Sequence, residues 1–125
     1  TRPARLIIEE LRKNGHKQPV IGFPKGIGEG LITYVDQSGV DAVGLDHGVD
    51  PVWVDRNLPQ NFPVQGNLDP LSLLQAGPEM FRDIDHILDA FANRPHIFNL
   101  GHGITPPTPT ENVQLMLDHV RRHQG

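Results

Sequence analysis

The segment His96-Ile97-Phe98-Asn99-Leu100-Gly101-His102-Gly103 places a short apolar run directly before a polar loop that contains glycines. A second segment, Gln65-Gly66-Asn67-Leu68-Asp69-Pro70, follows the apolar run 62–64 in the same way. Each loop precedes a helix-like stretch. In α/β proteins, loops at strand ends lie over the scaffold and hold reactive groups. These two segments therefore predict strands that end in functional loops.

Similar apolar runs recur along the chain, and helix-like stretches separate them. We predict strands at residues 19–23, 42–45, 63–65 and 96–100, and helices at 3–14, at 31–38, from Pro51, from Pro78 and after Thr108. Strands that alternate with helices predict right-handed crossovers and a parallel sheet. Because the runs are short and apolar, we expect both faces of this sheet to be buried.

Local signals indicate how two of the helices form. Asp50 is expected to cap a helix that has Pro51 at its first position. In the first helix, the apolar residues Leu6, Ile7 and Leu11 are expected to lie on one face.

Three architectures fit this pattern: an open doubly wound sheet, a flavodoxin-like sheet and part of a β/α barrel. The polar residues that follow the predicted strands are Lys25, Asp46, His47, Gln65, Asn67, Asn99 and His102. A barrel would gather them on one face, which favours the barrel. A whole barrel has eight strands and about 250 residues. We therefore predict an α/β fold in which residues 1–125 form one partial-barrel domain of about four parallel strands.

Composition excludes several classes of function. The 125 residues are 37% hydrophobic and 21% charged, which is typical of a globular chain. Because the chain has no cysteine, it can form neither a disulfide nor a thiolate zinc site. The net charge of −4 argues against nucleic-acid binding. No apolar run reaches the length of a membrane span, and no secretion leader is visible, so we expect a cytoplasmic location.

The glycine-rich turn 26–30 has two interpretations. Its backbone amides, with Lys25 just before them, could cradle an anion at a helix N-terminus. Alternatively, the glycines only make a tight turn between a strand and a helix. The turn is not a nucleotide fingerprint, because the third glycine is misplaced and no GK[ST] sequence is present.

Histidine and carboxylate side chains raise the question of a metal site. Asp46, His47 and His102 are suitable ligand types, but they come singly from distant loops. We therefore expect no metal, and we expect Asp46 to bond to backbone amides and fix a loop. His102 lies between glycines that let a ligand approach closely. Its imidazole can hydrogen-bond, carry a proton or pair with a carboxylate, or it can simply bond to neighbouring backbone.

The remaining histidines and the single tryptophan are assigned no chemistry. His96 begins a strand and is expected to pack or to bond to backbone, and Trp53 is expected to belong to the core. The histidines expected to be solvated are His16, His86, His119 and His123.

Four motifs together resemble the uroporphyrinogen decarboxylase family. They are the segments 20–26, 43–46, 65–70 and 96–104, in the order in which that family has them. The resemblance covers nearly the whole chain. It implies the C-terminal half of a (β/α)8 TIM barrel, roughly strands five to eight. The chain would then be a fragment whose N-terminal half-barrel lies elsewhere.

The resemblance also implies an activity. The family is a lyase of haem biosynthesis that converts the four acetate side chains of uroporphyrinogen III to methyls and so gives coproporphyrinogen III. It works as a cytosolic homodimer without metal or organic cofactor. His102 matches the family's Gly-His-Gly histidine, which lines the substrate cleft, so His102 is the predicted substrate-binding residue. No catalytic residue is assigned within the chain.

Other parts of the family's machinery are not found in this segment. The aspartate that binds the pyrrole N–H groups, the arginines, the tyrosine and a serine or threonine all belong to earlier segments of the family. Asp46 matches a different position from that aspartate, and His47 stands where the family usually has tryptophan. We therefore expect the fragment alone to be inactive.

Two other functions stay open at this point. One is a cobalamin-linked methyltransferase of the same superfamily, although that class uses a zinc–thiolate site and the chain has no cysteine. The other is a non-catalytic α/β module that binds an anion at the turn 26–30. A half-barrel would also have two unpaired edges, which invite association. We therefore expect the chain to be ordered only with its missing half or as a dimer of half-barrels.

Overall fold

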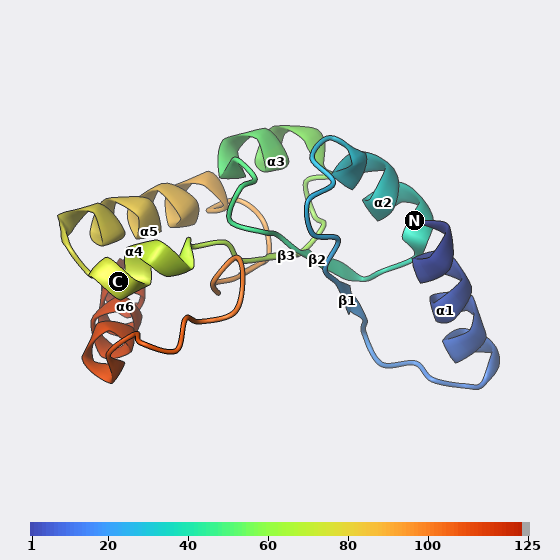
Figure 1. Ribbon diagram of the computed structural model, residues 1–125. Coiled ribbons are helices and arrows are strands. Elements are labelled where there is room, and N and C mark those ends of the chain that lie inside the picture. Colours follow the sequence, from blue (N-terminus) through green and yellow to red (C-terminus); the bar gives the residue numbers. More distant parts are fainter. Residues whose placement is uncertain (124–125) are drawn as a thin grey trace.

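The computed structural model describes residues 1–123, in which helices and strands alternate along the chain (Figure 1). The elements are α1 (Arg2–Lys13), β1 (Ile21–Gly22), α2 (Gly30–Ser38), β2 (Ala42–Gly44), α3 (Pro51–Asn57), β3 (Val64–Gln65), α4 (Pro70–Gln75), α5 (Pro78–Ala90), β4 (His96–Ile97) and α6 (Thr110–His123). No helix in this range is both long enough and apolar enough to cross a membrane.

The strands form one four-stranded parallel sheet in the order β1-β2-β3-β4. One row of residues paired in register across the four strands comprises Gly22, Val43, Val64 and His96. Each strand pairs with the next strand in sequence, which is the arrangement that consecutive β/α units give in a barrel. The predicted α/β fold with four parallel strands of a partial barrel is confirmed.

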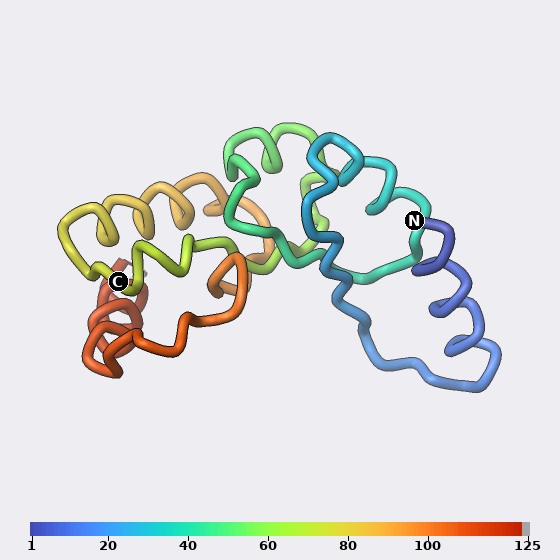
Figure 2. The backbone as a smooth tube through the Cα atoms, viewed as in Figure 1, coloured from blue at the N-terminus to red at the C-terminus, as the bar shows by residue number. Residues whose placement is uncertain are grey.

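Helices cover only one side of this sheet. The backbone trace shows α1, α2, α3 and α5 following one another in an arc around the strands (Figure 2). Val43 and Val64, in the row that faces the helices, are 0% exposed. In the alternate positions, Ile21 is 44% and Ile97 51% exposed. The expectation that both faces are buried is therefore wrong for the edge strands β1 and β4, because four strands do not close on themselves, whereas Ala42 on the inner strand β2 is only 8% exposed.

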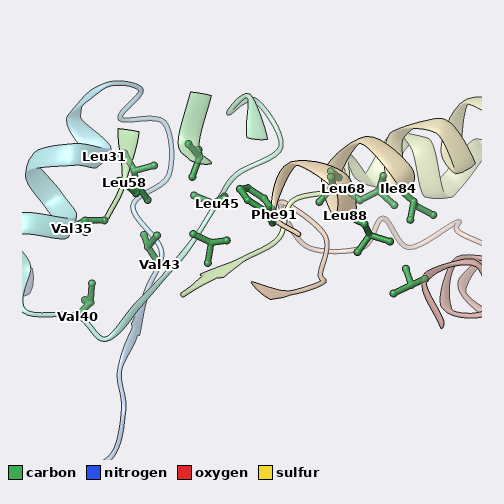
Figure 3. Packing of buried hydrophobic residues seen from close by; sticks show 14 of the residues in the cluster. Leu31, Val35, Val40, Val43, Leu45, Leu58, Leu68, Ile84, Leu88 and Phe91 are labelled. Carbon is green, nitrogen blue, oxygen red and sulfur yellow. The ribbon is translucent and has the colours of Figure 1, made fainter. Parts of the chain in front are cut away.

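The core lies between the sheet and this arc of helices. Leu68, Ile84 and Phe91 are at most 1% exposed. Figure 3 shows the buried side chains running from Leu31 on α2 to Ile84 on α5, and they belong to one cluster. Burying each side chain of this size stabilises the fold by about 1.5–3 kcal/mol. A continuous core therefore holds the strands, and the loops at their ends, in fixed positions.

Helix α1 buries a different residue from those expected. Ile8 is 7% exposed, whereas Leu6 and Ile7 are 51% and 62% exposed. The helix packs on α2, and Ala4 and Ile8, one turn apart, supply the packing face. The side of α1 that carries Leu6 and Ile7 is therefore not the side that packs on α2.

Two of the helices that follow strands begin with an Asp-Pro pair, in which the aspartate caps the helix. Asp50 Oδ1 accepts a hydrogen bond of 3.0 Å from the Val52 amide, so the predicted cap of α3 is confirmed. Asp69 Oδ1 likewise accepts one of 2.9 Å from the Leu71 amide and starts α4. Helix α4 was not predicted as a separate element, although the Asp69-Pro70 pair is a sequence signal for its start.

Candidate functional site

The loops after the four strands meet at one edge of the sheet, as the barrel interpretation predicts. Lys25 follows β1, Asp46 follows β2, Asn67 follows β3 and His102 follows β4. Hydrogen bonds join Lys25 to His102 and join Asp46 to both the first and the third loop. Side chains far apart in sequence therefore form one surface at the carboxyl ends of the strands.

Asp46 fixes two of these loops, which confirms its predicted role. Its Oδ2 accepts a hydrogen bond of 2.7 Å from the Gly26 amide, and its Oδ1 accepts one of 3.0 Å from the Gly48 amide. Both carboxylate oxygens thus have charge-assisted bonds to backbone N–H groups. The carboxylate holds the start of the turn 26–30 against the loop after β2.

The same contacts argue against an anion cradle in the turn 26–30. The Gly26 amide already binds the Asp46 carboxylate. The Gly30 amide donates to the Ile27 carbonyl at 2.9 Å, and the Leu31 amide donates to the Gly28 carbonyl at 3.0 Å. The Gly26, Gly30 and Leu31 amides are therefore already used, and the turn joins a strand to a helix.

Asn67 joins the second and third loops from a buried position. Its side chain is 4% exposed, and Nδ2 donates to the carbonyls of Asp46 at 3.0 Å and Val49 at 2.8 Å. Its Oδ1 is buried and has no hydrogen-bond partner within residues 1–123. Its position after a strand predicted its place at the edge of the sheet, but the sequence carries no signal for these contacts.

Gly101 brings the fourth loop against the second. A Cβ at this position would overlap the backbone nitrogen of His47 and come within 2.6 Å of its Cα. Only glycine allows so close an approach between two backbones. His102, the next residue, is therefore fixed beside the other three loops, and its side chain is exposed at the surface that they form.

A hollow of about 520 Å³ opens on the concave side of this edge. Its lining side chains are His102, Gln65 and Asn99, which are polar, and Phe23, Leu45, Leu100 and Ile104, which are apolar. Asn99 Oδ1 accepts a hydrogen bond of 2.8 Å from the Leu100 amide, which fixes the orientation of the Asn99 carboxamide. The hollow thus combines hydrogen-bond donors with apolar surface, as pockets for organic ligands do.

His102 makes one side-chain contact with another titratable group. Its Nε2 lies 3.0 Å from Nζ of Lys25, on the loop after the opposite edge strand. Both residues are predicted from sequence to follow strands, but their contact is not. Their separation of 77 residues is bridged only by the folded sheet.

The structure shows no metal centre in the part of the chain that it describes. No group of three histidine, aspartate or glutamate side chains within residues 1–123 is placed to hold a metal ion. The carboxylate oxygens of Asp46 are bound to amides, and His47 is exposed.

His96 lies beneath this edge and does not reach the hollow. Its Nε2–H donates to the Gly66 carbonyl at 2.6 Å, and its ring packs 4.8 Å from that of Phe91. Burial lowers the pKa of His96 below the ordinary value of 6.5, and the hydrogen bond to Gly66 opposes part of this change. The expectation that His96 packs and bonds to backbone is confirmed.

Comparison with known proteins identifies one family. The family model described as uroporphyrinogen decarboxylase matches residues 1–123. A protein named uroporphyrinogen decarboxylase from Novosphingobium aromaticivorans is 60% identical over 119 residues. Proteins of the same name from Sphingopyxis alaskensis and Rhizorhabdus wittichii are 53% and 50% identical over 119 residues.

These relatives are much longer than the present chain. Each alignment covers 95% of this chain and 35% of the relative, so the chain spans about a third of their length. The matches agree with the family resemblance seen in the sequence motifs. They do not favour the methyltransferase or the anion-binding module.

Proposed function

The chain belongs to the uroporphyrinogen decarboxylase family, and from this premise we propose that it contributes part of a uroporphyrinogen III decarboxylase. In this proposal, residues 1–125 form the last four β/α units of the barrel. The other units carry the aspartate for the pyrrole nitrogens and the basic residues. The enzyme works as a cytoplasmic homodimer without metal or organic cofactor, as the family resemblance implies.

The position of His102 supports this proposal most strongly. The imidazole lies at the carboxyl edge of the sheet and lines a hollow with Gln65 and Asn99, where active sites of β/α barrels are found. An imidazole can donate a hydrogen bond to a carboxylate or pair with it in charge. The proposed substrate carries carboxylates around its whole periphery, so His102 has a clear partner.

The chemistry of each decarboxylation follows from the pyrrole ring. Protonation of the ring carbon creates a cation that can accept the electron pair of the breaking C–C bond. Carbon dioxide leaves, and the former acetate CH2 becomes an exocyclic methylene. That carbon then takes up a proton to become methyl, while the ring loses the proton it had gained. In sum, one acetate and one proton give one methyl group and one carbon dioxide.

This chemistry needs groups that the hollow itself does not supply. A carboxylate close to the pyrrole nitrogens would stabilise the cationic ring, because charge pairing is strong where water is excluded. The carboxylate of Asp46 is held by two amides and does not line the hollow. We therefore assign substrate binding to His102 and no catalytic step to any other residue of the chain.

A chimera tests the proposal. The 119 matched residues of the Novosphingobium aromaticivorans relative would be replaced by the present chain. We expect this chimera to release carbon dioxide from uroporphyrinogen III and to form coproporphyrinogen III, and the 125-residue chain alone to do neither. A folded chimera without turnover, beside an active parent, would contradict the proposal.

A further inference from the structure

The contact between Lys25 and His102 crosses the open side of the sheet. The two residues follow β1 and β4, the first and last strands of the described sheet. Neighbouring strands lie about 4.8 Å apart, so these outer strands are separated by roughly 14 Å. The loops after the two strands and the long lysine side chain together close this span. Lys25 Nζ lies 3.0 Å from Nε2 of His102, which lines the hollow, whereas Lys25 itself is not one of the lining residues.

The contact determines which ring nitrogen of His102 carries the proton. An ammonium group has three N–H donors and no acceptor. Nε2 of His102 must therefore accept the hydrogen bond from Lys25, and the proton of the neutral ring lies on Nδ1. The pair thus retains the Nδ1–H of His102 and two N–H groups of Lys25 as donors for a ligand.

The surroundings of the pair leave this positive charge available. Within residues 1–123, no aspartate or glutamate lines the hollow, although the chain as a whole has a net charge of −4. The carboxylate of Asp46, on the loop after β2, has both oxygens bound to the Gly26 and Gly48 amides. A carboxylate that binds His102 in the hollow therefore lies beside the Lys25 ammonium, and no acidic residue of the described chain lines the hollow.

We propose that Lys25 is a second substrate-binding residue, which together with His102 anchors a carboxylate of the tetrapyrrole that does not react. This inference rests on the proposed function, because it names a further binding residue of the same site. The reacting carboxylate loses its charge as it becomes carbon dioxide. A cation held against it would stabilise the ground state more than the transition state and would slow the reaction. A neighbouring carboxylate keeps its charge throughout, so an anchor there supplies uniform binding.

Because the anchored carboxylate keeps its charge throughout, loss of Lys25 should weaken substrate binding without slowing the chemical step. In the chimera, Lys25→Met should raise KM for uroporphyrinogen III about five- to tenfold and leave kcat within about twofold, as expected for the loss of one partly solvated charge-assisted contact. Lys25→Arg should restore most of the affinity, and Lys17→Met, which removes an equal charge from an exposed loop, should leave KM unchanged. An unchanged KM, or a fall in kcat at constant KM, would overturn the proposal.

A second readout does not depend on turnover. The imidazole 15N shifts of His102 in the chimera, assigned with His102→Gln, should report an unprotonated Nε2 and an Nδ1–H. In Lys25→Met they should move toward the Nε2–H form, and in Lys25→Arg they should not. A ring with Nε2–H in the unmodified chimera, or no response to Lys25→Met, would overturn the pairing. If the chimera is inactive while the predicted shifts appear, the proposed function fails and the pairing stands.

Discussion

Asp46 Oδ2 lies 2.7 Å from the backbone nitrogen of Gly26, so one carboxylate ties the loop after β2 to the loop that carries Lys25. The same side chain binds the Gly48 amide through Oδ1. Charge-assisted bonds to backbone N–H groups are about twice as strong as neutral ones. This contact therefore holds the edge of the sheet together and positions Lys25.

We expect Asp46→Asn to destabilise the protein. An asparagine presents an NH2 group where one carboxylate oxygen stood, so one of the two amides loses its acceptor. The free energy of unfolding should fall by about 1–2 kcal/mol, measured by urea denaturation. Asp36→Asn, at an exposed position in α2, is the matched control and should change stability by less than about 0.5 kcal/mol. Equal effects of the two changes would show that the Asp46 contacts contribute nothing.

Asn67 should tolerate substitution poorly. In Asn67→Asp, a carboxylate would face the Asp46 and Val49 carbonyls that now accept from Nδ2, at a site only 4% exposed. Because two donors are lost and acceptors then face one another, we expect a loss of about 3 kcal/mol or more in unfolding free energy. Asn61→Asp, an identical change at an exposed position, is the control. If Asn67→Asp were as stable as Asn61→Asp, the hydrogen bonds from Asn67 to the Asp46 and Val49 carbonyls would not contribute to stability.

The buried guanidinium of Arg94 should be as sensitive to substitution as the side chain of Asn67. It is 6% exposed and binds Asp55 Oδ1 at 2.8 Å, together with the carbonyls of Asp55, Leu58, Pro59 and Phe62. A lysine cannot reproduce this planar set of donors. Arg94→Lys should therefore lower the unfolding free energy by about 3 kcal/mol, whereas Arg82→Lys on an exposed helix face should be neutral. Thermal or urea unfolding of both variants checks this.

His96 gives a predicted pH dependence. Burial lowers its pKa in the folded state, so at a pH below the ordinary value of 6.5 the unfolded chain binds more protons than the folded one. The contribution of His96 is therefore fully present above that value and is lost as the pH falls. The stability difference between the unmodified chain and His96→Phe should shrink between about pH 7.5 and pH 5. A difference that stays constant with pH would contradict a neutral buried imidazole.

The order of strands and helices could be predicted from the sequence, but the side-chain contacts between them could not. Apolar runs and the Asp50-Pro51 signal predicted strands and helices correctly, because those signals are local. The contact between Lys25 and His102 could not be predicted, because it depends on the register and curvature of four strands. The burial of Arg94 is equally non-local, since its partners lie on α3 and the loop that follows it. Ile8 was missed because the packing face of α1 depends on its contact with α2, which the local sequence does not show.

In the candidate site, too, local signals could be predicted from the sequence and non-local contacts could not. Residue type and position after a strand singled out His102 and Asp46, and the structure brings their loops together. The spacing of residues could not show that the carboxylate of Asp46 is occupied by the Gly26 and Gly48 amides. That occupation assigns Asp46 a structural role and removes the Gly26 amide from the donors of the turn 26–30.

The most direct test of this account is the dissociation constant of uroporphyrin, the stable oxidised form of the proposed substrate, for the chimera and its His102→Ala variant. We predict saturable binding that weakens at least tenfold in His102→Ala and is unchanged in His86→Ala, whose histidine is exposed and lies outside the hollow. Equal affinity of His102→Ala and the unmodified chimera would contradict the claim that this histidine binds a substrate carboxylate.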